Sequence, residues 1–218
     1  MSSVEKQRSK KLEHDDQSGF EFVKEMLSED CTAAVNFDRL QKHPEHGYFI
    51  MEYLLCEEGQ KVTPYTSHPN RYWKKNATKF LSLWRAKLNF SATLYLVNYA
   101  KKGTKSENEI LLIKVLDMDE TGIVDQVITK HTREEFSQWF RKLNSECLTG
   151  KDDLLKEIYA YKSSDELGKY VLQAGKYKGK TIEDVFECDC SYVEWFSKQR
   201  FSYSIVAACY MEKKKADH

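Results

Sequence analysis

One run of residues limits the possible folds more than any other: YFIMEYLLCEE, residues 48–58. Its first nine side chains are apolar or aromatic, with Glu52 as the exception. A strand with apolar side chains on both sides has to be covered on both faces, so this run belongs in the centre of a sheet. Strand-like patterns also occur at residues 32–41, 60–67, 91–102 and 108–119.

Helical patterns separate these strands. We expect helices over residues 18–30, 70–89 and 132–148, and in the last of these Thr132 and Glu135 form a capping box. The order is then helix, three strands, helix, two strands and a closing helix. This order predicts an α/β fold with a central mixed sheet flanked by helices.

The chain has 218 residues, which is enough for one large domain or two small ones. We expect a disordered polar tail, an α/β domain, a helical connector and a small, mainly helical module. These parts correspond to residues 1–17, 18–148, 149–168 and 169–218.

Charge and cysteine content limit the class of protein. The 34 basic and 34 acidic residues cancel, so nucleic-acid binding would need a local basic patch rather than a net charge. The six cysteines include no CxxC pair, and the charged N-terminus carries no apolar run. We therefore expect a cytoplasmic protein with reduced cysteines and no membrane partner.

Glu52 is the first candidate for chemistry, because an ionised carboxylate among apolar neighbours needs a partner. Asp38 ends the preceding strand-like run, and a hairpin would bring the two carboxylates together. Two converging carboxylates suit Mg²⁺ or Mn²⁺, which can assist phosphate hydrolysis. The simpler alternatives are that Glu52 faces solvent or pairs with a basic residue of the next helix.

The pattern over residues 18–116 resembles the PD-(D/E)xK, or restriction-endonuclease-like, nuclease superfamily. Its core is a helix, a three-stranded meander, a helix and a further strand. The resemblance implies that Asp38 and Glu52 hold the metal. The family's lysine position is Leu54 here, and in divergent members the lysine comes from the next helix, where Lys79 is best placed and Lys75 is the alternative.

A second candidate is SHPNRYWKKN, residues 67–76, at the start of a predicted helix. A helix N-terminus attracts anions, and Arg71, Lys74 and Lys75 would add positive charge for nucleic acid. We expect Trp73 to lie in the core rather than to stack on bases.

The stretch GKYKGKTIEDVFECDCSYVEWF resembles the C-terminal module of exodeoxyribonuclease X-like proteins. Gly175 and Gly179 allow a tight turn, and Thr181 can cap the following helix. Tyr192 and Trp195 lie three residues apart on one helical face, which predicts core positions for both.

Lys176, Lys178 and Lys180 alternate around the same turn. Three ammonium groups there suit a phosphate backbone, although a merely solvated turn is an equal alternative. Because the family's module accompanies DNA-processing proteins, the resemblance favours DNA as the partner.

Two functions follow. The first is a metal-dependent nuclease in which Asp38, Glu52 and Lys79 are catalytic and the C-terminal lysines bind nucleic acid. The second is a non-catalytic factor of phage or mobile-element type that binds DNA or inhibits another protein on a degenerate nuclease scaffold. Many members of the superfamily dimerise, so the resemblance also allows a homodimer.

Overall fold

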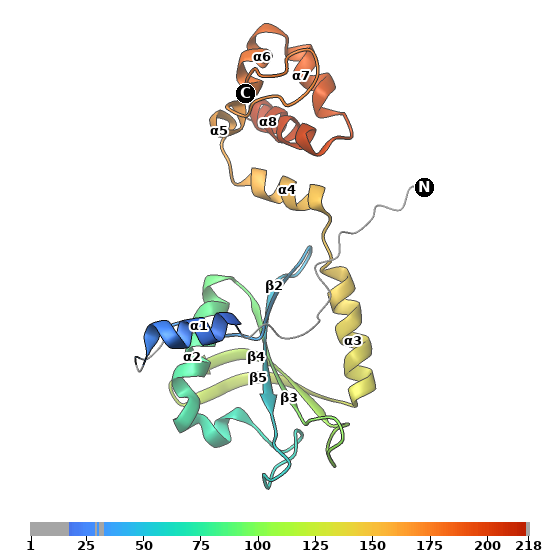
Figure 1. Ribbon diagram of the computed structural model, residues 1–218. Coiled ribbons are helices and arrows are strands. Elements are labelled where there is room, and N and C mark those ends of the chain that lie inside the picture. Colours follow the sequence, from blue (N-terminus) through green and yellow to red (C-terminus); the bar gives the residue numbers. More distant parts are fainter. Residues whose placement is uncertain (1–17, 29, 31–32, 217–218) are drawn as a thin grey trace. The chain divides into compact units, whose positions relative to one another are not determined.

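The computed structural model describes residues 18–28, 30 and 33–216, so the tail expected at residues 1–17 lies outside them. Contacts between residues divide the chain into two units, one ending at Leu148 and the other beginning at Thr149. Figure 1 shows the helices and strands of the two units.

The N-terminal unit holds a mixed sheet. Its elements are α1 (Ser18–Leu27), β1 (Arg39–His43), β2 (Gly47–Leu55), η1 (Pro69–Tyr72), α2 (Trp73–Asn89), β3 (Thr93–Tyr99), β4 (Ile110–Asp119), β5 (Gly122–His131) and α3 (Arg133–Glu146). The described strands form one sheet in the order β1-β2-β3-β4-β5. β2 and β3 are parallel and the other neighbours are antiparallel. The predicted α/β fold with a mixed sheet flanked by helices is confirmed.

Helices α2 and α3 cover opposite faces of the sheet, as Figure 1 shows. The alternation of side chains along β2 explains this. Ile50 packs in one cluster with Phe80 of α2, whereas its neighbours Phe49 and Met51 pack with Leu143 of α3. Even-numbered residues of β2 therefore face α2, and Glu52 is one of them.

The strand predicted at residues 60–67 is wrong, because this segment forms turns. The backbone N–H groups of Thr66 and Ser67 both donate to the carbonyl of Thr63, at 2.9 Å. Pro64 has no N–H to donate to a neighbouring strand. Among the described residues between α1 and α2 there are two strands, not the expected three-stranded meander.

Strand β5 occupies residues to which the sequence patterns assigned no element. Asp119 organises the β4–β5 turn, since its Oδ1 accepts from the N–H groups of Thr121 and Gly122. Gly122 has φ +148°, and a Cβ there would collide with the Asn70 side chain. Helix α3 then begins with the predicted Thr132–Glu135 capping box, which is confirmed.

The outer edge of β5 is bonded by side chains from the loop before α2. The Asn70 side-chain amide donates to the Ile123 carbonyl and accepts from the Ile123 N–H, each at 2.9 Å. At the other end of the strand, the Tyr65 hydroxyl donates to the His131 carbonyl at 2.9 Å. This loop therefore follows the edge of the sheet.

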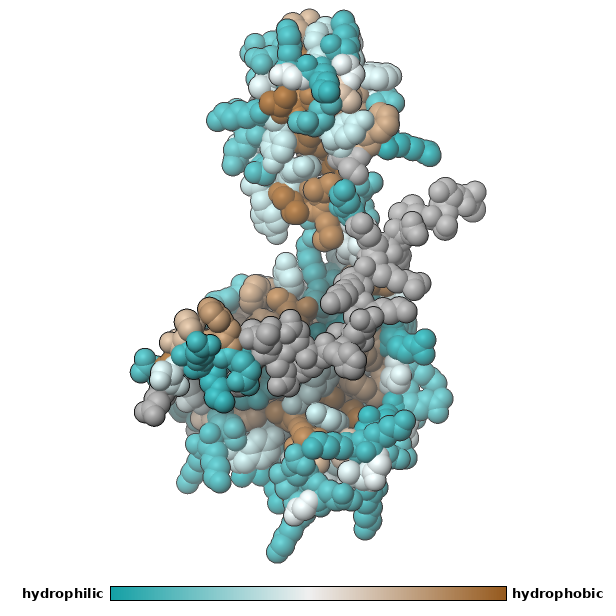
Figure 2. Space-filling model, in the orientation of Figure 1, coloured by the Kyte–Doolittle hydropathy of each residue, from teal (hydrophilic) through white to brown (hydrophobic). Residues whose placement is uncertain are grey.

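The C-terminal unit is helical. It contains α4 (Lys151–Ala160), α5 (Ser164–Gly168), α6 (Ile182–Cys188), α7 (Cys190–Ser197), η2 (Ser202–Ser204) and α8 (Ile205–Ala216). Its core surrounds Tyr210, Leu167 and Ile182, which are fully buried. The visible surface of both units is mainly hydrophilic, with separate hydrophobic patches (Figure 2). None of the described helices is long and apolar enough to span a membrane.

Two leucines of α2 test the core assignment. Leu83 is fully buried against the sheet, whereas Leu88 on the same helix is exposed. We expect Leu83→Ala to lower the free energy of unfolding by about 2–5 kcal/mol, because it leaves a cavity. Leu88→Ala should change it by about 0.5 kcal/mol or less. Chemical denaturation of both variants measures the difference, and equal losses would contradict the assignment.

Candidate functional site

Glu52 and Lys79 form an ion pair between the sheet and the helix that covers it. Glu52 is only 4% exposed and lies on the face of β2 that packs against α2. The Lys79 Nζ contacts Glu52 Oε1, while the Lys79 side chain stays about half exposed. The contact fits both expectations for Glu52: an ion pair with the next helix, and a lysine supplied from that helix.

Asp38 lies opposite Glu52 across the β1–β2 hairpin. The register ends with Arg39 paired to Met51, and Asp38 directly precedes Arg39. Asp38 is close enough to Glu52 for its charge and its backbone N–H to act on the Glu52 carboxyl. Asp38 is fixed by the Tyr53 N–H, which donates to its Oδ2 at 2.6 Å. The structure therefore brings together Asp38, Glu52 and Lys79, the three residues predicted to be catalytic.

The protonation of Glu52 reflects competing effects. Burial raises the pKa of Glu52 above its ordinary value of 4.5, and the negative charge of Asp38 adds to this rise. The hydrogen bond and charge of Lys79 lower the same pKa without cancelling the rise. Glu52 Oε2 is buried without a hydrogen-bond partner among the described residues. A buried oxygen without a partner is unusual. The Asp38 backbone N–H also acts on this carboxyl and, like Lys79, lowers its pKa.

A pocket of 580 Å³ opens beside Lys79, and we call it the cationic pocket. It is formed by the end of β2, the loop that follows, η1 and α2, and its basic side chains are Lys61, Arg71 and Lys79. No acidic side chain lines it. Arg71 is held in place because its guanidinium donates to the Thr66 carbonyl at 3.0 Å. Lys61 was not a predicted site residue, since it falls in the segment misread as a strand.

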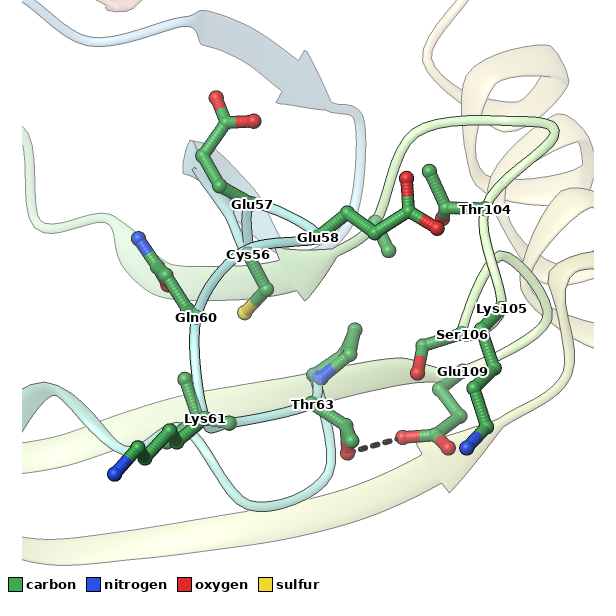
Figure 3. A pocket seen from close by; sticks show the side chains of 13 residues that line it. Cys56, Glu57, Glu58, Gln60, Lys61, Thr63, Thr104, Lys105, Ser106 and Glu109 are labelled. Atoms are coloured by element: carbon green, nitrogen blue, oxygen red, sulfur yellow. Dashed lines mark hydrogen bonds between the residues drawn. The ribbon is translucent and has the colours of Figure 1, made fainter.

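A second pocket of 440 Å³ adjoins the first and shares Lys61 with it. Figure 3 shows its side chains, including a hydrogen bond from the Thr63 hydroxyl to Glu109. Because Glu57, Glu58 and Glu109 line this second pocket, it is less suited to phosphate than the cationic pocket.

The remaining basic residues predicted at the start of α2 lie on its surface. Lys74 and Lys75 are exposed and do not line the cationic pocket. Trp73 is buried, and its ring N–H donates to the Glu120 carbonyl at 2.9 Å. The predicted core position of Trp73 is confirmed. His68 caps η1, since its side chain accepts from the Asn70 N–H.

In the C-terminal unit, the glycines of the predicted turn are structural. Gly175 and Gly179 have φ +85° and +91°, which favours glycine at both positions. A Cβ on Gly175 would collide with the Tyr192 hydroxyl, which accepts from the Lys176 N–H at 3.1 Å. Thr181 caps α6 as predicted, accepting from the Asp184 N–H.

Asp189 joins this turn to α7. Its Oδ1 accepts from the Ser191 hydroxyl at 2.8 Å and from the Tyr192 N–H at 3.1 Å. Its Oδ2 accepts from the Tyr177 hydroxyl at 2.9 Å and from Lys176 Nζ at 3.3 Å. The hydrogen bonds from Ser191 and Tyr177 are the main reason that the pKa of Asp189 falls to about 2.

The three predicted nucleic-acid-binding lysines of the turn differ in their contacts. Lys176 forms an ion pair with Asp189. Lys178 and Lys180 are exposed at the surface. The predicted core position of Trp195 is wrong, because the side chain is 53% exposed, whereas Tyr192 is half-buried against the core.

Comparison with known proteins identifies part of this unit. A family model described as exodeoxyribonuclease X-like C-terminal matches residues 175–201. The match supports the predicted module and points to a nuclease-related function. A search of curated proteins and a search of solved structures each found no match. The resemblance of the N-terminal unit to the PD-(D/E)xK superfamily stays a prediction.

The ion pair predicts the titration of Glu52. We expect the pKa of Glu52 to lie above 4.5 and to rise further in Lys79→Met, because Lys79 opposes the effect of burial. NMR titration of the Glu52 carboxyl carbon, assigned by its loss in Glu52→Gln, measures both values. Lys87→Met is the control, since Lys87 lies on the same helix over the Trp84 ring. A Glu52 pKa at or below 4.5 in the wild type would contradict the arrangement.

Because the pKa of Asp189 is lowered, we expect the free energy of unfolding of the C-terminal unit to depend on pH. Its lowered pKa means that ionised Asp189 stabilises the fold above pH 3.8, and that this is lost as pH falls toward about 2. Asp189→Asn should therefore unfold at a lower temperature near neutral pH, and its difference from wild type should shrink between pH 3.8 and about 2. The indole NMR signal of Trp195, the unit's sole tryptophan, reports the transition.

Glu187→Gln on the exposed surface of α6 is the matched control, for which we expect little change. A difference between Asp189→Asn and wild type that stayed constant with pH would show that the amide substitution acts through shape rather than charge.

Proposed function

We propose that this protein is a metal-dependent nuclease. Its N-terminal unit would hydrolyse phosphodiester bonds, and its C-terminal module would bind nucleic acid, with DNA as the favoured substrate. The observation that carries the proposal is the meeting of Asp38, Glu52 and Lys79 beside a pocket lined by basic and not acidic side chains. The family match of the C-terminal module supports the same class of substrate.

The two carboxylates fit a divalent metal such as Mg²⁺ or Mn²⁺. Asp38 and Glu52 offer the hard oxygen ligands that these ions prefer, and Glu52 Oε2 is buried with no partner among the described residues. Mg²⁺ commonly uses one or two carboxylates and takes its other ligands from water and phosphate. When bound, such an ion polarises phosphate oxygens and generates a reactive water.

The basic side chains have separate roles in this proposal. Lys79 contacts Glu52 and also lines the pocket, so it can stabilise negative charge that develops on a phosphate. Arg71 and Lys61 would hold the flanking phosphates from the other walls of the pocket. Lys74 and Lys75 add charge on the exposed surface of α2.

One set of observations favours a second candidate, a binding protein without catalysis. Leu54 occupies the position of the superfamily's lysine, and Lys79 already forms an ion pair with Glu52. The part of the chain that the structure describes contains no group of three or more His, Cys, Asp or Glu side chains placed to hold a metal. On this alternative the protein would bind DNA or block another protein on a nuclease-like scaffold.

Cleavage assays separate the two candidates. Single- and double-stranded DNA and RNA are incubated with the full chain and Mg²⁺ or Mn²⁺, with chelator in a parallel reaction. We expect metal-dependent cleavage that Glu52→Gln reduces about 100-fold or more, because the charge that would hold the metal is lost. Lys79→Met should also reduce cleavage, while binding of the substrate persists.

Glu57→Gln is the matched control, because Glu57 lines the neighbouring pocket and not the cationic one. Its activity should equal that of the wild type. Cleavage that survives both Glu52→Gln and chelator would sink the proposed site. Tight binding of nucleic acid without cleavage by the wild type would favour the second candidate.

A further inference from the structure

The basic turn of the C-terminal unit, residues 175–180, is linked to an exposed tryptophan by ring contacts. The Lys176 and Lys180 ammonium groups lie 4.6 and 5.9 Å from the centroid of the Tyr177 ring. The Tyr177 ring meets Tyr192 edge-on at 4.9 Å, and Tyr192 contacts Trp195 at 5.4 Å. Trp195 is the end of this series, with 53% of its surface exposed.

A second branch of the same ring network also reaches the surface. Tyr192 stacks on buried Phe196 at 6.1 Å, and Phe196 stacks on Tyr203 at 5.9 Å. Tyr203 and Phe201 are stacked at 5.1 Å with an interplanar angle of 10°. Phe201 is 48% exposed and Tyr203 is 38% exposed.

Exposed aromatic rings offer flat apolar faces on which other rings can stack. Here three of them belong to one network that begins at the basic turn. Exposed Arg200 precedes Phe201 in the sequence and adds a cation. Lys176 and Lys180 lie over the half-buried Tyr177 ring, which the ring contacts join to the exposed rings. Positive charge combined with exposed aromatic faces is complementary to a chain of phosphates with accessible bases.

We infer that the C-terminal unit binds single-stranded nucleic acid, with its phosphates at the basic turn and its bases stacked on Trp195, Phe201 and Tyr203. In a duplex the faces of the bases are already stacked on one another, so these rings would have no partner. The inference rests on the proposed function and specifies its substrate class as single-stranded.

Binding to matched probes tests the inference. The full chain carrying Glu52→Gln, which limits cleavage, is titrated into a fluorescent single strand of about 20 nucleotides and into its duplex. Loss of one stacked base corresponds to a reduction in affinity of about 5- to 150-fold. We expect losses in this range for single-strand binding by Trp195→Ala and by Phe201→Ala, and little change for the duplex.

Two variants separate stacking from damage to the fold. Trp195→Phe keeps an aromatic face and should keep most of the affinity. Tyr161→Ala removes a ring that is 86% exposed in the same unit but outside the network, and it should bind as the wild type does. Equal losses in Trp195→Phe and Trp195→Ala would show that the side chain does not act by stacking, which overturns the inference.

The remaining outcomes distinguish the inference from the proposed function. If replacing Lys176, Lys178 and Lys180 by alanine weakens binding and the aromatic variants do not, the unit holds phosphates alone and the stacking inference falls. Equal affinity for the single strand and the duplex would likewise show that the unit binds phosphates without stacking on the bases, and would overturn the inference. If the protein binds neither probe, the inference and the binding role of the module both fall, whereas the cleavage assays on Glu52→Gln decide the nuclease separately.

Discussion

The ion pair between Glu52 and Lys79 is the interaction on which the N-terminal unit depends. A carboxylate on the buried face of β2 is costly, and removing its partner would leave an uncompensated charge in the core. Lys79 offsets this cost only in part, because burial still raises the pKa of Glu52 and one of its oxygens has no partner among the described residues.

Much of the fold could be predicted because the strongest signals are local. The doubly apolar run at residues 48–58 required cover on both faces, and α2 and α3 provide it. The errors arise where neighbours in space decide the structure. Residues 60–67 have the composition of a strand, but hydrogen bonds around Thr63 close them into turns. Strand β5 is held by its pairing with β4, whose register no short pattern reveals.

The candidate site was predictable to a similar extent. Asp38 and Glu52 could be singled out because Glu52 interrupts an apolar strand and Asp38 directly precedes the strand that pairs with it. Lys61 could not, since it reaches the cationic pocket from a loop whose path depends on the rest of the unit. The predicted core position of Trp195 is wrong for another reason. Spacing along α7 places it beside Tyr192, but the spacing of residues cannot say how much core a small helical unit has available to cover them.

The loop between β2 and α2 has a second consequence, for the behaviour of the protein at high concentration. An edge strand with free backbone groups is a template on which another chain can add, and this is a common route to aggregation. The Asn70 side chain forms both backbone hydrogen bonds of Ile123 that a neighbouring strand would form. The Tyr65 hydroxyl donates to the His131 carbonyl, which is then not free to pair with another chain. The segment that supplies Lys61 and Arg71 to the pocket therefore also bonds backbone groups on the outer edge of β5. Substitutions at Asn70 or Tyr65 would therefore expose backbone groups of β5 and favour association of chains at high concentration.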